Sequence, residues 1–215
     1  MRTKVEIPGP FTKAFGIVAS LGAAARDFVA VEFLKSTRHN PRMIYVLAYP
    51  EFEPSCAGRI RGFRAKHEPQ RAKLVPPHIT LVFGAKGEHL QTITELVEAV
   101  TSQTHELPIA FDDHAIEFDP FEQKYKIFLL CGDGSCTVSA LHNQLYDGEH
   151  RAELSSTHPF RPHMTIATYD ERAEIERVNV SDAGELPVCG KLRALEIVRF
   201  SNGELSTLKT VPFRQ

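Results

Sequence analysis

The sequence predicts an α+β protein built from two related lobes. Three observations lead to this prediction: β-rich runs alternate with segments of helical periodicity, the order β-α-β-α-β occurs twice, and 85 residues separate His78 from His163 at matching places in the two copies. Of the 215 residues, 42% are hydrophobic and 24% charged, which is typical of a globular domain. We expect a pseudo-two-fold arrangement in which two antiparallel sheets face a central cleft.

The first copy contains three β-rich runs separated by two helical segments. Pro50 closes the first apolar run, and Pro76 and Pro77 open the second. Apolar residues three and four positions apart predict an amphipathic helix after the second run. The expected elements are a strand at 43–49, a helix at 53–68, a strand at 78–83 closed by Gly84, a helix at 88–101 and a strand at 107–118.

The second copy repeats this order and adds a hairpin at its end. A glycine-rich turn at 132–135 leads into a helical segment, and Asn202-Gly203 is a strong signal for a tight hairpin turn. We expect lobe one to span about 43–120 and lobe two about 121–213. The expected elements are a strand at 125–131, a helix carrying Val138, Leu141 and Leu145, a strand at 163–169, a short helix at 170–177, and strands at 189–200 and 205–211.

Residues 1–42 form an extension before the duplicated region. Apolar residues from Val18 to Val29 recur at helical spacing, so this extension is predicted to be helical. Its longest apolar stretch, 15–25, is shorter than the roughly 20 residues that a membrane-spanning helix requires. We therefore expect no membrane association. We also expect a cytoplasmic, monomeric protein.

Charge and cysteine content narrow the possible functions. The formal net charge is −2, whereas proteins that coat long nucleic acids need many cationic contacts with phosphates. The four cysteines form no C-x-x-C pair and fit no common zinc spacing, so they are predicted to be free thiols. No phosphate-binding loop, dinucleotide fingerprint or serine-hydrolase elbow occurs.

The tetrapeptide pattern Pro-His-x-Thr occurs once in each copy, with His78 and Thr80 in the first and His163 and Thr165 in the second. Side chains alternate between the two faces of a strand, so each histidine and its threonine share one face. If a two-fold axis relates the lobes, both faces line the same cleft. Two imidazoles can then divide acid and base work near neutral pH, while two hydroxyls donate hydrogen bonds to phosphate oxygens.

These motifs resemble the paired HxTx motifs of the 2H phosphoesterase superfamily. The surrounding Pro-His-Ile-Thr-Leu-Val-Phe and Phe-Arg-Pro-His-Met-Thr-Ile-Ala are similar to its RNA 2′,3′-cyclic phosphodiesterase branch, also called 2′-5′ RNA ligase-like. The resemblance covers about 43–213. It implies a bilobal fold, a catalytic set of His78, Thr80, His163 and Thr165, and metal-free cleavage without a cofactor. The implied substrate is a small nucleotide or an RNA end with a cyclic phosphate, or a 2′-5′ linkage.

Further residues are candidates for substrate binding. Arg161 lies two positions before His163 and could meet a phosphate, although an exposed rim arginine is an equally good interpretation. Tyr45 and Phe83 could stack on a base, with core packing as the alternative role. Tyr169 could close the second motif strand at the rim of the cleft. A basic group (Arg59, Arg61, Arg64 and Lys66) either attracts a polyanion or forms a solvated helix face.

Two other functions compete with a metal-free phosphodiesterase. A nucleotide- or RNA-end-binding module could use the same cleft with little turnover, and a hydrolase could use the histidines as metal ligands. Pure binding does not need two proton-transfer groups. Neither His-x-Thr pair supplies the additional ligand that metal sites usually require nearby.

Overall fold

The computed structural model describes residues 43–154 and 158–215, so the predicted N-terminal helix lies outside the described residues. Strands and helices alternate along the chain in the order that the sequence predicts for the larger elements. The strands are β1 (Met43–Ala48), β2 (Glu51–Phe52), β3 (Ile79–Lys86), β4 (Leu107–Asp119), β5 (Lys124–Cys131), β6 (His163–Tyr169), β7 (Val188–Leu192), β8 (Ala194–Ser201) and β9 (Glu204–Pro212). The α-helices are α2 (Pro54–His67), α3 (Pro69–Leu74), α4 (Leu90–Gln103), α5 (Ser135–Leu145) and α6 (Arg172–Ile175), and the 3-10 helices are η2 (Gly87–His89), η3 (Glu149–Glu153) and η4 (Val180–Ala183).

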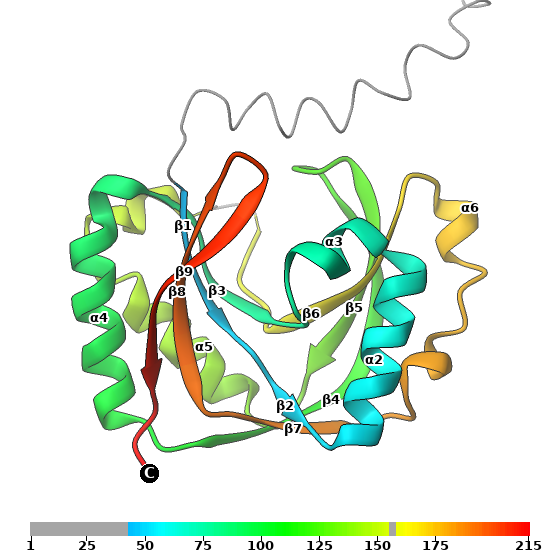
Figure 1. Ribbon diagram of the computed structural model, residues 1–215, viewed down its shortest axis with the longest axis horizontal. Coiled ribbons are helices and arrows are strands. Elements are labelled where there is room, and N and C mark those ends of the chain that lie inside the picture. Colours follow the sequence, from blue (N-terminus) through cyan, green and yellow to red (C-terminus); the bar gives the residue numbers. More distant parts are fainter. Residues whose placement is uncertain (1–42, 155–157) are drawn as a thin grey trace, which may run out of the picture.

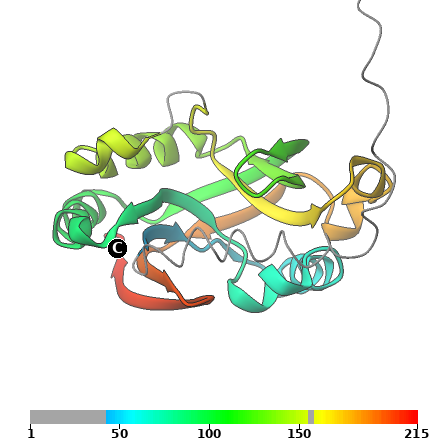
Figure 2. The same cartoon turned by 90° about the horizontal axis from the view of Figure 1, so that it is seen from above.

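The strands form two antiparallel sheets, which confirms the predicted bilobal α+β fold. One sheet has the order β3-β1-β8-β9, and the other has the order β2-β7-β4-β5-β6. Helices α4 and α5 lie at one end of the molecule, and α2 and α6 lie at the other (Figures 1 and 2). The two strands that begin with the histidine motifs, β3 and β6, are each an edge strand of a different sheet.

The predicted lobe boundary near residue 120 does not describe how the sheets are built. Strand β4 pairs with β5 and β7 in the second sheet, and β8 pairs with β1 in the first. The last strand of each β-α-β-α-β copy therefore joins the sheet of the other copy. Sequence periodicity identifies a strand but not its partner, and the short turn between β4 and β5 favours a hairpin within one sheet.

The predicted strand at 189–200 is also two strands in different sheets, β7 and β8, which are separated at Arg193. The stretch Leu192-Arg193-Ala194 contains no proline or glycine, so the crossing from one sheet to the other leaves no break in the sequence. Strand β3 continues beyond Gly84, which adopts a φ of 51° at an irregularity of the ladder with β1. Glycine adopts that left-handed conformation without strain, so Gly84 bends the strand instead of ending it.

The two lobes share one hydrophobic core because their helices also cross between them. Helix α2 follows β1 in the chain but packs against β6, and α5 follows β5 but packs against β3. Buried side chains from both sheets, including Ile79, Leu81, Met164 and Ile166, belong to the same cluster. Each motif strand is therefore held in place from its core side by a helix of the other copy.

A buried ion pair anchors the end of α2 beside β6. The guanidinium of Arg64 donates to the Glu68 carboxylate and, through Nη1, to the carbonyl oxygen of Val75 at 3.0 Å. The second carboxylate oxygen of Glu68 accepts a hydrogen bond from Thr168 at 3.1 Å. These bonds connect α2, the segment before β3, and β6.

We expect Glu68→Ala to lower the free energy of unfolding by about 3 kcal/mol, because it leaves the Arg64 charge buried without a partner. Urea unfolding of the variant measures this change through the midpoint. The double variant Arg64→Met/Glu68→Leu should recover most of the loss. Glu176→Ala, which breaks the exposed pair with Arg172 of the same i, i+4 spacing, is the control and should unfold like the unaltered protein. A Glu68→Ala midpoint equal to that of the control would contradict this account.

Candidate active site

His78 and His163 occupy equivalent places in the two lobes. His78 immediately precedes β3 and His163 is the first residue of β6. These edge strands approach each other without forming a ladder, as the contact between them and the separate sheets show. Their proximity is visible where β3 and β6 meet near the centre of Figure 1. The fold therefore brings the two predicted motifs together from segments 85 residues apart.

Each histidine ring is fixed by a hydrogen bond to the backbone two residues before it. Nδ1 of His78 lies 2.8 Å from the carbonyl oxygen of Pro76, and Nδ1 of His163 lies 2.7 Å from the carbonyl oxygen of Arg161. A carbonyl oxygen only accepts, so Nδ1 is the protonated nitrogen in both neutral rings. Nε2 of each ring is left with a lone pair that can take or, once protonated, give a proton.

Burial and nearby cations favour the neutral form of both rings. Burial is the main reason that the pKa of His78 is lowered to about 4. The charges of Arg71, Arg64 and His163 also lower it, whereas the hydrogen bond to Pro76 raises it. Burial likewise lowers the pKa of His163 below its ordinary value, with the charge of Arg161 in the same direction. Because a charge on His163 acts on His78, the two rings belong to one electrostatic site.

Each motif strand contains a β-bulge directly after its threonine. Directly after Thr80 and Thr165, the strand carries one extra residue, Leu81 or Ile166, that has no partner in the neighbouring strand. Both unpaired residues are completely buried in the core. This matching bulge anchors the backbone next to each hydroxyl. The flanking pairs are Leu47–Thr80 and Val46–Val82 in one sheet, and Phe128–Thr165 and Ile127–Ala167 in the other.

Aromatic rings support the histidines from the neighbouring strand or loop. The ring centroids of Phe128 and His163 lie 4.1 Å apart, and Tyr49 meets His78 edge-on at 6.1 Å. The sequence analysis missed both residues, because their role depends on strand pairing and not on spacing along the chain. Such contacts restrict rotation of the imidazoles and exclude water from one side of each ring.

Three secondary candidates differ in their exposure and contacts. Phe83 is 48% exposed and follows the buried Val82, so its ring is available for stacking. Tyr45 is half-buried and packs against a small cluster containing Leu47, as its alternative role implied. Arg161 is exposed and forms an ion pair with Glu117, while its backbone carbonyl holds His163.

Tyr169 lies on the opposite face of β6 from Thr165, and its hydroxyl contacts α2. Simple alternation would place it on the face of Thr165, but the bulge at Ile166 reverses the alternation. Tyr169 lies opposite Tyr125, whereas Thr165 lies opposite Phe128, three residues further along β5 and hence on the other face. The Tyr169 hydroxyl instead lies 2.7 Å from Nδ1 of His67 on α2.

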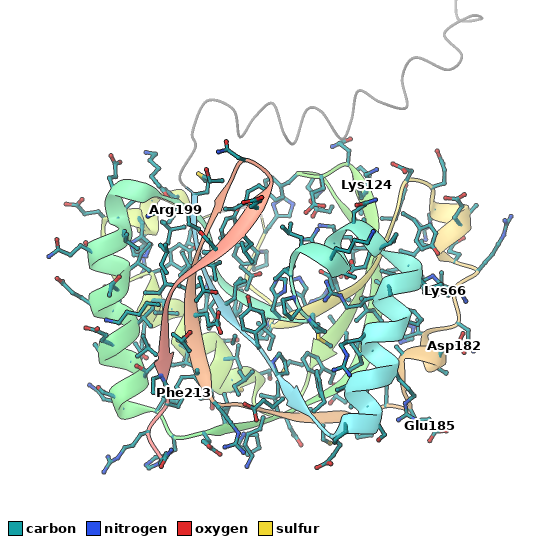
Figure 3. The ribbon with its side chains drawn as sticks, viewed as in Figure 1. Lys66, Lys124, Asp182, Glu185, Arg199 and Phe213 are labelled. Carbon is teal, nitrogen blue, oxygen red and sulfur yellow. The ribbon has the colours of Figure 1, made fainter. Side chains whose placement is uncertain are left out.

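The basic group predicted on α2 does not form a single surface. Arg64 is buried against Glu68, whereas Lys66 lies on the outer side of the molecule with Asp182 nearby (Figure 3). The charges of Lys66 and Asp182 act in opposite directions on the pKa of His67, which burial lowers. A solvated helix face therefore describes Arg59, Arg61 and Lys66 better than a polyanion-binding strip.

Acidic residues in the middle of the chain hold cations beside the site. Glu122, in the turn after β4, accepts from Nη1 of Arg71 with both carboxylate oxygens at 3.0 Å and from Nζ of Lys126 at 2.8 Å. Burial alone would raise the pKa of Glu122, but the charges of Arg71 and Lys126 hold it below its ordinary value. Asp119 also accepts from Lys126, at 2.5 Å. The sequence analysis did not single out Arg71 or Lys126, because only the fold joins them.

An open hollow of about 560 Å³ lies beside the residues that precede His163. It is lined by one face of α5 and by Phe160, Arg161 and Pro162, and it includes two of the free cysteines, Cys131 and Cys136. None of the four motif side chains lines it. Within 43–154 and 158–215, no group of three or more histidine, cysteine, aspartate or glutamate residues is arranged to hold a metal ion.

Two imidazoles and two hydroxyls lie on adjoining edge strands, an arrangement suited to acid–base chemistry at a phosphate. Comparison with known proteins agrees with this interpretation. The model of the 2′-5′ RNA ligase superfamily matches residues 52–204, so the chain belongs to that superfamily.

The relatives support a phosphoesterase-type enzyme. A protein named "Putative phosphoesterase OB1230" from Oceanobacillus iheyensis is 28% identical over 132 residues, which cover 56% of this chain and 74% of that protein. A crystal structure described as a phosphoesterase has a TM-score of 0.57 at 18% identity and covers 81% of this chain and 99% of its own. LigT of E. coli complexed with 3′-AMP has a TM-score of 0.55 at 19% identity, with the same coverages, and shows the same fold.

The described part of the chain contains no helix that is both long and apolar enough to cross a membrane.

The pH dependence of the reaction should reflect the lowered histidine pKa values. One ring must be neutral to act as base and the other protonated to act as acid, so kcat/KM is highest between their two pKa values in the free enzyme. Because both are lowered, we expect the optimum of kcat/KM below pH 6.5. Steady-state rates with a cyclic nucleotide between pH 4 and 9 measure it, and an optimum above pH 7 would contradict the burial of these rings.

Phe83 and Tyr169 should behave differently when their rings are altered. We expect Phe83→Ala to raise KM for a cyclic nucleotide roughly fivefold, because loss of base stacking costs on the order of 1 kcal/mol. Tyr169→Phe should leave KM unchanged and affect only the bond to His67. Equal effects of the two substitutions on KM would show that the assignment of the faces of β6 is wrong.

Proposed function

We propose that this protein is a metal-independent phosphodiesterase that cleaves cyclic phosphodiesters of small nucleotides or of RNA ends. His78, Thr80, His163 and Thr165 form its catalytic set. The observation that carries the proposal is the matched pair of Nδ1 hydrogen bonds. They leave the lone pair of Nε2 in each neutral ring for proton transfer, and a charge on His163 acts on His78. A binding protein has no need for two such proton-transfer groups.

The reaction follows from these positions. Water attacks phosphorus and passes its proton to His78, whose lowered pKa keeps the ring unprotonated at neutral pH. The bond between phosphorus and the leaving ribose oxygen breaks, and protonated His163 gives its proton to that oxygen. Thr80 and Thr165 donate hydrogen bonds to the non-bridging oxygens as negative charge builds on them. The anionic substrate itself raises the pKa of His163 and so favours the protonated acid.

The nature of the substrate is supported by the family and by one solved neighbour. The superfamily name refers to 2′-5′ linkages of RNA, and LigT of E. coli has been crystallised with 3′-AMP. A 2′,3′-cyclic phosphate is the simplest substrate of this class, because its ring already holds the leaving group close to in-line geometry. The exposed Phe83 supports recognition of a base beside the phosphate.

We expect His78→Ala and His163→Ala each to lower kcat on 2′,3′-cyclic AMP at least 100-fold, because each variant lacks one proton-transfer group. The assay contains EDTA, and activity of the unaltered protein should survive it. Calorimetry with the nucleotide product should show that both variants still bind. His114→Ala, which alters an exposed histidine of β4, is the matched control and should retain full activity.

The alternative function, a binding module, gives a different result in the same experiments. A binding module would leave both 2′,3′-cyclic AMP and a cyclic-ended oligonucleotide intact while still binding them. Loss of activity in EDTA that zinc or manganese restores would contradict the metal-independent mechanism.

A further inference from the structure

The proposed catalytic set has no permanent positive charge. At neutral pH both imidazoles are largely neutral, because burial lowers their pKa values, and threonine hydroxyls are uncharged. A phosphodiester carries a negative charge, and moving it out of water is costly unless a cation or several donors meet it. A cation beside the histidines is therefore expected in a site of this composition.

Four cations act electrostatically on the two histidines, and each of them forms an ion pair with an acidic side chain. Arg64 and Arg71 act on His78, while Arg161 and Lys126 act on His163. The side chain of Arg64 is only 2% exposed and is paired with Glu68. Lys126 is 4% exposed and contacts two carboxylates. Arg161 is 48% exposed, but its guanidinium is paired with Glu117.

Arg71 differs from these three because one of its guanidinium nitrogens is buried without a hydrogen-bond partner among the described residues. Both of its hydrogen bonds to Glu122 come from Nη1, and the side chain is 31% exposed. That buried nitrogen is Nε. A buried donor without a partner is unfavourable, so a guanidinium in this state is well suited to receive an acceptor from a ligand.

Arg71 is connected to both motif strands, β3 and β6. It lies on α3, four residues before the loop of Val75 to Pro77 that leads to His78, and its charge also acts on Tyr45 of β1. Glu122, which holds Nη1, is held in turn by Lys126 of β5, the strand that pairs with β6. The chain Arg71–Glu122–Lys126 thus fixes the guanidinium relative to both motif strands.

We propose that Arg71 binds the reacting phosphate of the substrate through the part of its guanidinium that Glu122 leaves unoccupied, with Glu122 as the residue that positions it. This assignment rests on the proposed phosphodiesterase function and adds a charged substrate-binding residue to the four motif side chains. The planar guanidinium offers adjacent N–H donors for phosphate oxygens, which a lysine ammonium cannot reproduce in the same geometry.

The substitutions Arg71→Ala and Arg71→Lys test the assignment with 2′,3′-cyclic AMP as substrate. We expect Arg71→Ala to lower kcat/KM roughly 10- to 100-fold, as for loss of a hydrogen bond to a charged group, and Arg71→Lys to retain an intermediate activity. Arg61→Ala, which removes an exposed arginine of α2, is the matched control and should retain full activity. Unchanged kcat/KM in Arg71→Ala would overturn the proposal.

Chemical rescue separates substrate binding from a purely structural role. Methylguanidine at millimolar concentration should restore part of the activity of Arg71→Ala, because it can occupy the vacated space beside the phosphate. It should not restore His78→Ala. If Arg71→Ala unfolds at lower urea concentration and is not rescued, and Arg71→Lys is as inactive as Arg71→Ala, the residue acts through folding and the proposal fails.

Binding of inorganic phosphate distinguishes failure of this proposal from failure of the proposed function. Calorimetry should show at least tenfold weaker phosphate binding in Arg71→Ala and unchanged binding in Arg61→Ala. If the unaltered protein cleaves no cyclic nucleotide but this difference in phosphate affinity is found, Arg71 binds phosphate and only the phosphodiesterase function is contradicted. Equal phosphate affinities of all three proteins contradict the role of Arg71 itself.

Discussion

The candidate site depends on one interaction that occurs twice, the hydrogen bond from Nδ1 of a motif histidine to the carbonyl oxygen two residues before it. This bond decides which nitrogen carries the proton and aims the other away from the backbone. Because it is local, each motif carries its own orienting acceptor, Pro76 or Arg161. The fold then needs only to bring the two short segments together for the rings to act as a pair.

The exchange of strands and helices between the two copies brings these segments together. Strand β4 of the first copy lies in the second sheet, and β8 of the second copy lies in the first sheet. Helices α2 and α5 each pack against the motif strand of the other copy. A change that separated the lobes would therefore break the shared core as well as the site. The ion pair of Arg64 and Glu68, which reaches both the loop before β3 and Thr168 of β6, strengthens this dependence.

Sequence periodicity and spacing predict the larger strands and helices, the duplication and the four motif residues, because these depend on local alternation and on residue chemistry. They do not predict which sheet β4 and β8 join, since strand pairing is decided by long-range packing. They do not predict the face of Tyr169 for a related reason, because the bulge at Ile166 reverses alternation and has no signal in the sequence. Arg71 and Lys126 are found only through Glu122, which lies far from Arg71 in the chain.

Nitrogen NMR of the two motif histidines, with and without inorganic phosphate, tests the central claim most directly. The account predicts that at pH 7 both rings are neutral, that Nδ1 is protonated and Nε2 is not, and that phosphate shifts both Nε2 signals together and raises both pKa values. Protonation at Nε2 in either neutral ring, or a phosphate response confined to one histidine, would contradict the claim that the two rings share one site.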